Sequence, residues 1–304
     1  MQTKNMNIMR NNIWIILLSL VFAACGKEDT LTPVEEKNWL LLDEPAADAP
    51  AYDKAIYAFY KETGIPIYYN DTIGKETRVV HGQEVTYYET LKIAYTLEGY
   101  SFYMEYDYFT RDEVANLPID EFIALLKTKI LASIPDNVSI PSVLLFKRLY
   151  ENTDFTAYWG FKTIGIVLPE TIGADFGGMI LAAIAKQFVI DQDSKSLQTF
   201  YDLTNVTFRE SPYGKDYWTL ELDYDSLGGR DATVEDLYPF GFIEDIPGGW
   251  EQFAPSQAQD VEMYLRAVFT KSLTEFSAEF AAHPVCIKKF ELMQGIATSL
   301  GFKM

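Results

Sequence analysis

Histidine and cysteine are scarce in this chain, which has two of each among 304 residues. Zinc sites in proteins are built mainly from these two residue types. His81 and His283 stand far apart, so neither has the second histidine four residues away that a helical zinc motif requires. The two cysteines, Cys25 and Cys286, are too few for a cysteine metal cluster, and Cys286 is expected to be a small buried hydrophobe.

Basic residues are also few. The chain has 25 Lys and Arg against 44 Asp and Glu, a formal net charge of −19. The negative electrostatic field of such a chain repels phosphate backbones, so nucleic-acid binding is not expected.

The motifs Gly-x-Ser-x-Gly, Gly-x-Gly-x-x-Gly and the P-loop are absent from the sequence. A carboxylate pair for glycoside hydrolysis stays open, because so many acids make accidental pairs certain.

The apolar run at the N-terminus is too short to cross a membrane. It covers Ile13–Ala24 and follows the basic residues Lys4 and Arg10. A helix of that length rises about 18 Å, whereas a hydrocarbon core measures roughly 30 Å. The run therefore predicts a signal peptide over residues 1–24. It ends in Phe22-Ala23-Ala24-Cys25, which resembles a lipobox and implies diacylglycerol and an N-acyl chain on Cys25. An ordinary secretory signal with a chance cysteine is the alternative.

The residues after the lipobox predict a tether. Gly26-Lys27-Glu28-Asp29 resembles the surface-export signal of lipoproteins in the Bacteroidota, which implies anchoring in the outer membrane on the side of the cell exterior. A solvated acidic tether is the alternative interpretation. Prolines, acids and alanines dominate residues 25–50, which we expect to be a lipidated tether, with Trp39–Leu42 apolar enough to dock on the body. Residues 51–304 are expected to form one domain.

Helical and strand patterns follow one another in the body and predict an α+β fold. Tyr- and Phe-rich residues over 85–96 and 100–109 suggest a hairpin-like pair. Helices are expected over residues 51–63, 120–134, 175–188, 257–280 (with a break near Ser272) and 284–300. Strands are expected over residues 65–69, 142–150, 161–168 and 218–224.

Three pairs of stretches carry a resemblance to a known family. They are Tyr52–Tyr60 with Ile65–Tyr69, Ala157–Gly160 with Ile164–Val167, and Gly249–Asp260 with Lys288–Glu291. They resemble the substrate import-associated zinc metallohydrolase lipoproteins of the Bacteroidota, a zinc-binding metallopeptidase group. The resemblance implies a zincin-like body with a mixed sheet, a central helix and C-terminal helices. It also implies a partnership with a TonB-dependent transporter and its surface lipoprotein.

The chain departs from this family at the metal helix. The family pattern His-Glu-x-x-His-Gln-Phe falls on residues 182–188, where Ala182 and Lys186 take the histidine positions and Ala183 takes the glutamate position. Alanine offers neither a metal ligand nor a general base, and a lysine ammonium repels a zinc ion. We therefore expect a degenerate member of the family, with no catalytic zinc.

Other residues give weaker signals. Asp260 aligns with a downstream acidic element of the family, but the following glutamate falls at Met263, so Asp260 is assigned no ligand role. Asp223, Asp225 and Asp231 lie among glycines and are weak calcium candidates, with a solvated acidic loop as the alternative. Some aromatic residues are candidates for a sugar-stacking or peptide-binding platform, although such rings more often fill cores: Trp159, Trp218 and Trp250.

Two functions remain. The first is a non-catalytic binding or accessory lipoprotein of a nutrient-import locus. The second is a peptidase-like hydrolase with a relocated carboxylate site, which predicts a cleft where two or more acids converge near Lys186. A purely structural surface role is a third option, favoured if no cleft lies above the helix over residues 175–188.

Overall fold

The computed structural model describes residues 38–93, 105–151, 153–154, 156–191, 195–205, 233–244 and 255–304. The described helices and strands all belong to one compact unit, Trp39–Met304. They include a mixed sheet and several helices, which confirms the predicted α+β class. Several candidate residues lie outside the described ranges: Cys25, Trp218, Asp223, Asp225, Asp231 and Trp250.

The central sheet has four strands. Their order is β1 (Ile67–Tyr68), β5 (Val143–Phe146), β9 (Ile164–Val167) and β8 (Ala157–Trp159). The first three run parallel, and β8 runs antiparallel to β9. Because β8 is last in this order, it forms one edge of the mixed sheet.

The two faces of this sheet pack against different cores. Alternate side chains of β5 point in opposite directions, as in any strand. Val143 and Leu145 belong to the main core, which includes most of the helices, whereas Leu144 and Phe146 belong to a smaller cluster with Leu91. Because both faces are covered, β5 consists of four buried apolar residues without polar alternation.

The first helices follow the predicted ranges with one interruption. Helix α2 (Ala51–Thr63) ends at Gly64, whose φ of 75° is a left-handed cap that glycine adopts without strain. The helix expected over 120–134 is divided into α4 (Ile119–Leu125), a π-helical turn (Leu126–Ile130) and α5 (Leu131–Ser133). The short helix α3 (Arg111–Val114) precedes them, capped by Thr110.

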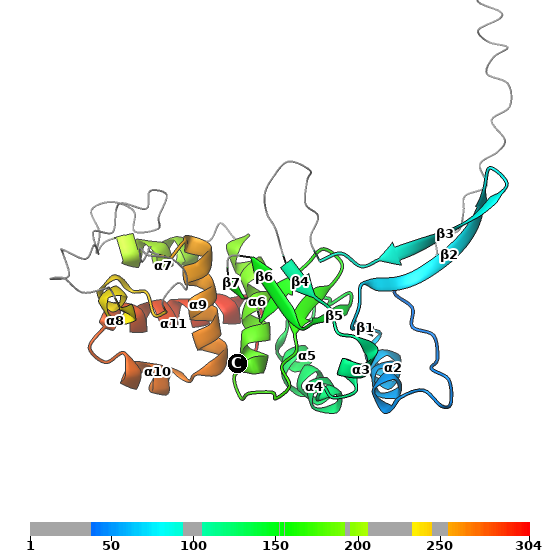
Figure 1. Ribbon diagram of the computed structural model, residues 1–304. Coiled ribbons are helices and arrows are strands. Elements are labelled where there is room, and N and C mark those ends of the chain that lie inside the picture. Colours follow the sequence, from blue (N-terminus) through cyan, green and yellow to red (C-terminus); the bar gives the residue numbers. More distant parts are fainter. Residues whose placement is uncertain are drawn as a thin grey trace, which may run out of the picture. The chain divides into compact units, whose positions relative to one another are not determined.

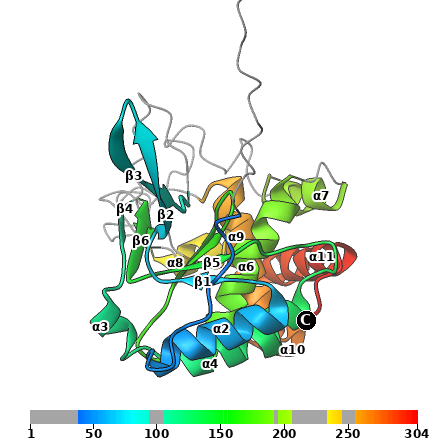
Figure 2. The same ribbon diagram turned by 90° about the vertical axis from the view of Figure 1, so that its right-hand side faces the viewer.

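Helices α6 (Phe176–Ile190) and α9 (Gln257–Thr270) lie side by side, as Figures 1 and 2 show. The approach is close at Gly178, where an added Cβ would lie 2.5 Å from Cγ2 of Thr270 and 2.8 Å from the carbonyl oxygen of Phe269. The small residues early in α6 therefore serve helix packing. Most of α6 is buried, which makes it the central helix of the unit.

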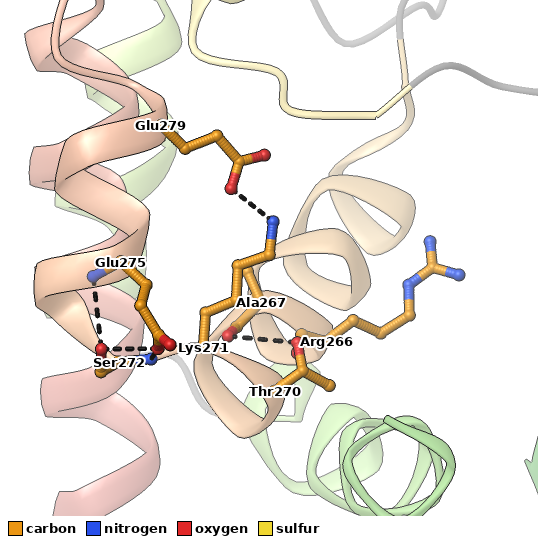
Figure 3. Close-up of polar contacts among 7 residues, drawn as sticks. All are labelled: Arg266, Ala267, Thr270, Lys271, Ser272, Glu275 and Glu279. Carbon is orange, nitrogen blue, oxygen red and sulfur yellow. Dashed lines mark hydrogen bonds and ion pairs between the residues drawn. The ribbon is translucent and has the colours of Figure 1, made fainter. Parts of the chain in front are cut away.

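The C-terminal helices are separated by sharp local signals. Helix α9 ends at Thr270, and α10 (Leu273–Glu279) begins with a capping box, in which Ser272 Oγ accepts the Glu275 amide and the Glu275 carboxylate accepts the Ser272 amide (Figure 3). The predicted break near Ser272 is confirmed. Helix α11 (Pro284–Ser299) follows, and the remaining helical segments are α7 (Lys195–Asn205), α8 (Val234–Leu237) and the 3-10 turn Tyr238–Phe240.

A long hairpin extends away from the sheet (Figures 1 and 2). Strands β2 (Thr72–Val80) and β3 (Gln83–Thr90) are joined by His81 and Gly82, with φ of 51° and 78°. Two left-handed residues in a row match the twist of a two-residue hairpin turn.

The predicted pairing of residues 85–96 with 100–109 is wrong for the described residues. Strand β3 pairs with β2, and β4 (Glu105–Asp107) pairs with β6 (Arg148–Glu151), which also pairs with β7 (Thr153–Asp154). The polar, mostly exposed β2 lacks the apolar alternation by which strands are recognised, so its role as a partner was missed. No helix in the described ranges has the length and apolar character needed to cross a membrane.

Candidate functional site

A cleft of about 260 Å³ lies where helix α6 faces the edge strand β8. It combines apolar and aromatic walls with a few polar groups, as ligand sites usually do. One acidic side chain from α9 completes its wall. The lining residues are Ala157, Tyr158, Trp159, Ala183, Lys186, Gln187, Ile190 and Glu262.

The cleft includes two of the three degenerate motif positions. Ala183 and Lys186 line it, one helical turn apart on α6. Ala182 is fully buried and does not contribute to the lining. Of the two positions that the family pattern assigns to metal ligands, 182 and 186, only position 186 therefore borders the cleft.

The cation at position 186 is matched by an acid from the neighbouring helix. The Lys186 ammonium donates to Oε2 of Glu262 at 2.5 Å, and the two side chains are 28% and 22% exposed. The sequence alignment placed the expected acid at Met263, which is buried in the core. Glu262 and Arg266 lie four residues apart and so share the polar face of α9. This i, i+4 spacing is the sequence signal that would have identified Glu262.

A second ion pair stands close to the first. Arg266 donates to Oε2 of Glu244 at 2.5 Å. Burial raises the pKa of Glu244, the nearby Glu262 charge raises it further, and Arg266 lowers it. Glu262 and Glu244 are thus each paired with a cation of their own, Lys186 and Arg266. A relocated hydrolytic site requires two carboxylates that share a substrate and a water, whereas Glu262 is the one carboxylate among the described residues that line the cleft.

The described residues also offer no alternative metal cage. They contain no group of three or more His, Cys, Asp or Glu side chains that could hold an ion. His81 is exposed in the hairpin turn, and His283 precedes α11 with its ring edge-to-face on Tyr238. Cys286 is buried as predicted, and burial raises the pKa of its thiol to about 11.

No family model, curated protein or solved structure matches this chain. The zincin-like body and the lipoprotein assignment therefore stay predictions from the sequence stretches described above. The arrangement of a buried helix behind an antiparallel edge strand, with a cleft between them, is independent of that resemblance.

The edge strand presents main-chain groups as well as side chains. Strand β9 is the one neighbour of β8 among the described strands. Val167 donates its amide to the Thr156 carbonyl and Gly160 donates to Thr163, so residues 156, 158 and 160 face β9. In an antiparallel ladder the intervening residues face the other way. The amide and carbonyl groups of Ala157 and Trp159 therefore point to the edge of β8 that no other described strand pairs with, here called the free edge.

A buried ion pair elsewhere in the unit accounts for Asp260. Lys289 Nζ donates to Oδ2 of Asp260 at 2.6 Å and to Oγ1 of Thr204 at 2.7 Å, and both charged side chains are 0% exposed. The ammonium also stands 4.4 to 5.2 Å from three ring centroids: Phe200, Tyr264 and Phe242. Burial lowers the pKa of Lys289, and the Asp260 charge opposes that shift. The pair joins α7, α9 and α11, so its role is structural.

Proposed function

We propose that this chain is an outer-membrane lipoprotein, anchored through Cys25 and facing the cell exterior, that binds extended polypeptide without hydrolysing it. Its body is a zincin-like domain that has lost its metal, and it works beside a TonB-dependent importer and its surface lipoprotein. The cleft between α6 and β8 is the binding site.

The Lys186–Glu262 ion pair is the observation that carries this proposal. A positive charge stands at one of the histidine positions, and the carboxylate that lines the cleft already holds it. A zinc ion there would face a cation and would lack imidazole ligands. Without a metal-bound water and a general base, a peptide in the cleft is bound and released unchanged.

The free edge of β8 supports polypeptide as the ligand class. An extended chain adds to a sheet edge through main-chain hydrogen bonds, while side-chain pockets supply specificity. Ala157, which is 6% exposed, and the half-buried Trp159 direct their main-chain amide and carbonyl groups to this edge. The Trp159 ring and the Lys186–Glu262 pair then supply an apolar and a polar contact surface beside the edge.

The experiment uses the full-length lipoprotein in detergent. Metal analysis is expected to find no stoichiometric zinc, and casein is expected to remain uncut with or without a chelator. Reduced and carboxymethylated α-lactalbumin, labelled with fluorescein, is the unfolded polypeptide probe, and fluorescence anisotropy measures its binding. One zinc per chain with chelator-sensitive cleavage would refute the proposal.

A proline variant tests the edge strand itself. Ala157→Pro removes an amide that faces the free edge and leaves the bonds to β9 in place. Losing a main-chain partner costs about 1–3 kcal/mol, so the probe is expected to bind about 5- to 150-fold more weakly. Ala157→Ser keeps the amide and serves as the matched control. Equal binding by both variants would show that the edge of β8 is not used.

A further inference from the structure

A second cavity, of about 210 Å³, lies at the start of the body and is separate in its lining from the cleft of α6. Its walls come from the segment before α2, from α2 itself, and from the end of β1 with the following turn. Tyrosine, aspartate and asparagine line it around a floor of Ile56 and Ile67. The polar and aromatic lining residues include Asp43, Asp53, Tyr57, Tyr68, Tyr69 and Asn70.

Two of the aromatic walls are held in place by contacts within the chain. The Tyr68 hydroxyl donates to the carbonyl of Trp39, and the Tyr69 hydroxyl donates to Oδ1 of Asp53, both at 3.4 Å. The Tyr69 ring also packs edge-to-face on Tyr52. Burial raises the pKa of both Tyr68 and Tyr69 to about 12, so both phenols stay neutral. The cavity is thus preorganised, which lowers the entropic cost of binding.

Three polar groups of the lining form no hydrogen bond with the rest of the described chain. They are the Asp43 carboxylate, the Tyr57 hydroxyl and the side-chain amide nitrogen of Asn70. The Asn70 oxygen is occupied, because it accepts the amide of Thr72 at 3.1 Å. Together these groups provide acceptors and donors at the cavity, with orientation set by short loops and by α2.

The charges of the wall decide the ligand class. None of the described residues that line the cavity is basic, so an anion is disfavoured beside two carboxylates. Asp53 is already paired with Arg111 at 3.2 Å, and Asp43 is exposed, where solvent screens its attraction for a cation. A wholly apolar ligand would leave the polar groups unsatisfied. A neutral ligand with an apolar face and many hydroxyls satisfies all of these conditions.

We propose that this cavity binds a saccharide, one sugar ring in size. The apolar C–H face of the ring stacks on a tyrosine, and its hydroxyls bond to Asp43, Tyr57 and Asn70. The volume is below the roughly 300–1,000 Å³ of sites for drug-sized ligands, which fits a single ring. This site does not depend on the proposed peptide cleft, and each can fail without the other.

The test is saturation-transfer NMR and calorimetry on the full-length protein, kept in a polyoxyethylene detergent because maltoside detergents would compete. The probes are glucose, galactose, mannose, xylose and N-acetylglucosamine, with choline and lysine as cation probes. At least one sugar is expected to bind. Tyr57→Ala removes a ring face and a hydroxyl and is expected to weaken that sugar at least about tenfold. Asn70→Asp keeps the bond to Thr72, removes the amide donors and weakens the sugar about three- to tenfold.

The control is Tyr88→Ala, an exposed tyrosine of the hairpin that does not line the cavity. It is expected to leave sugar binding unchanged, and circular dichroism verifies that every variant is folded. Three results would each overturn the proposal: binding of no sugar in the panel, sugar binding that Tyr57→Ala and Asn70→Asp leave intact, or Tyr57-dependent binding of choline or lysine instead of sugar.

Discussion

Replacing Lys289 by methionine removes the ammonium that neutralises the Asp260 carboxylate in the core. Both side chains are 0% exposed and their charged atoms are 2.6 Å apart, so solvent cannot take over this neutralisation without the helices separating. Removing one partner of such a pair costs about 3–5 kcal/mol. Methionine keeps most of the apolar contact with the surrounding rings, so the loss is mainly electrostatic. Since domains are stable by about 5–15 kcal/mol, a large fraction of the stability is at stake.

Urea unfolding of the full-length protein in detergent, followed by circular dichroism, measures this loss. The midpoint is expected to fall while the slope stays constant. Replacing both partners, with Lys289→Met and Asp260→Leu, is expected to recover most of the stability, because an apolar pair needs no neutralisation. Lys288→Met is the matched control, exposed on the same helix, and is expected to stay within about 0.5 kcal/mol of the wild type. A loss below about 1 kcal/mol for Lys289→Met would contradict a buried, charged pair.

Three further outcomes follow from the same structure. Rebuilding the motif by Ala182→His, Ala183→Glu and Lys186→His is expected not to restore zinc binding in metal analysis, because position 182 is buried and does not line the cleft; one zinc per chain would contradict this placement of position 182. Gly178→Ala is expected to destabilise by about 1–3 kcal/mol in thermal unfolding, because its Cβ meets α9, whereas Gly295→Ala, with open space around it, is expected to stabilise by about 0.5–1 kcal/mol. Hydrogen bonds from Lys147 and Thr110 lower the pKa of Glu113 to about 2 from 4.5. The contribution of the Glu113 carboxylate to stability is therefore present above pH 4.5 and lost as the pH falls through 2. Glu113→Gln is expected to flatten that part of the stability profile, and NMR titration measures the pKa.

Part of the candidate site was foreseeable from the sequence. The pattern of residues 175–188 predicted the helix, and the family motif singled out positions 182, 183 and 186 on it, of which 183 and 186 line the cleft. Position 182 is buried instead. Glu262 was missed because the alignment pointed to its neighbour, Met263. An error of one residue turns a side chain by about 100° around a helix, enough to exchange a surface position for a core position.

The sequence by itself determined what depends on local chemistry or on counting. The helix end at Gly64 and the break at Ser272 follow from caps that act within a few residues. The scarcity of histidine excludes a zinc cage of the family type, whatever the fold.

Only the tertiary structure decided which distant groups meet. Lys186 and Glu262 are 76 positions apart, and Asp260 and Lys289 are 29 apart. Their pairing depends on how whole helices pack, as does the free edge of β8. Caps and periodicity reach over one or two turns, whereas an ion pair or a cavity is set by the summed packing of many elements, so no local pattern encodes it.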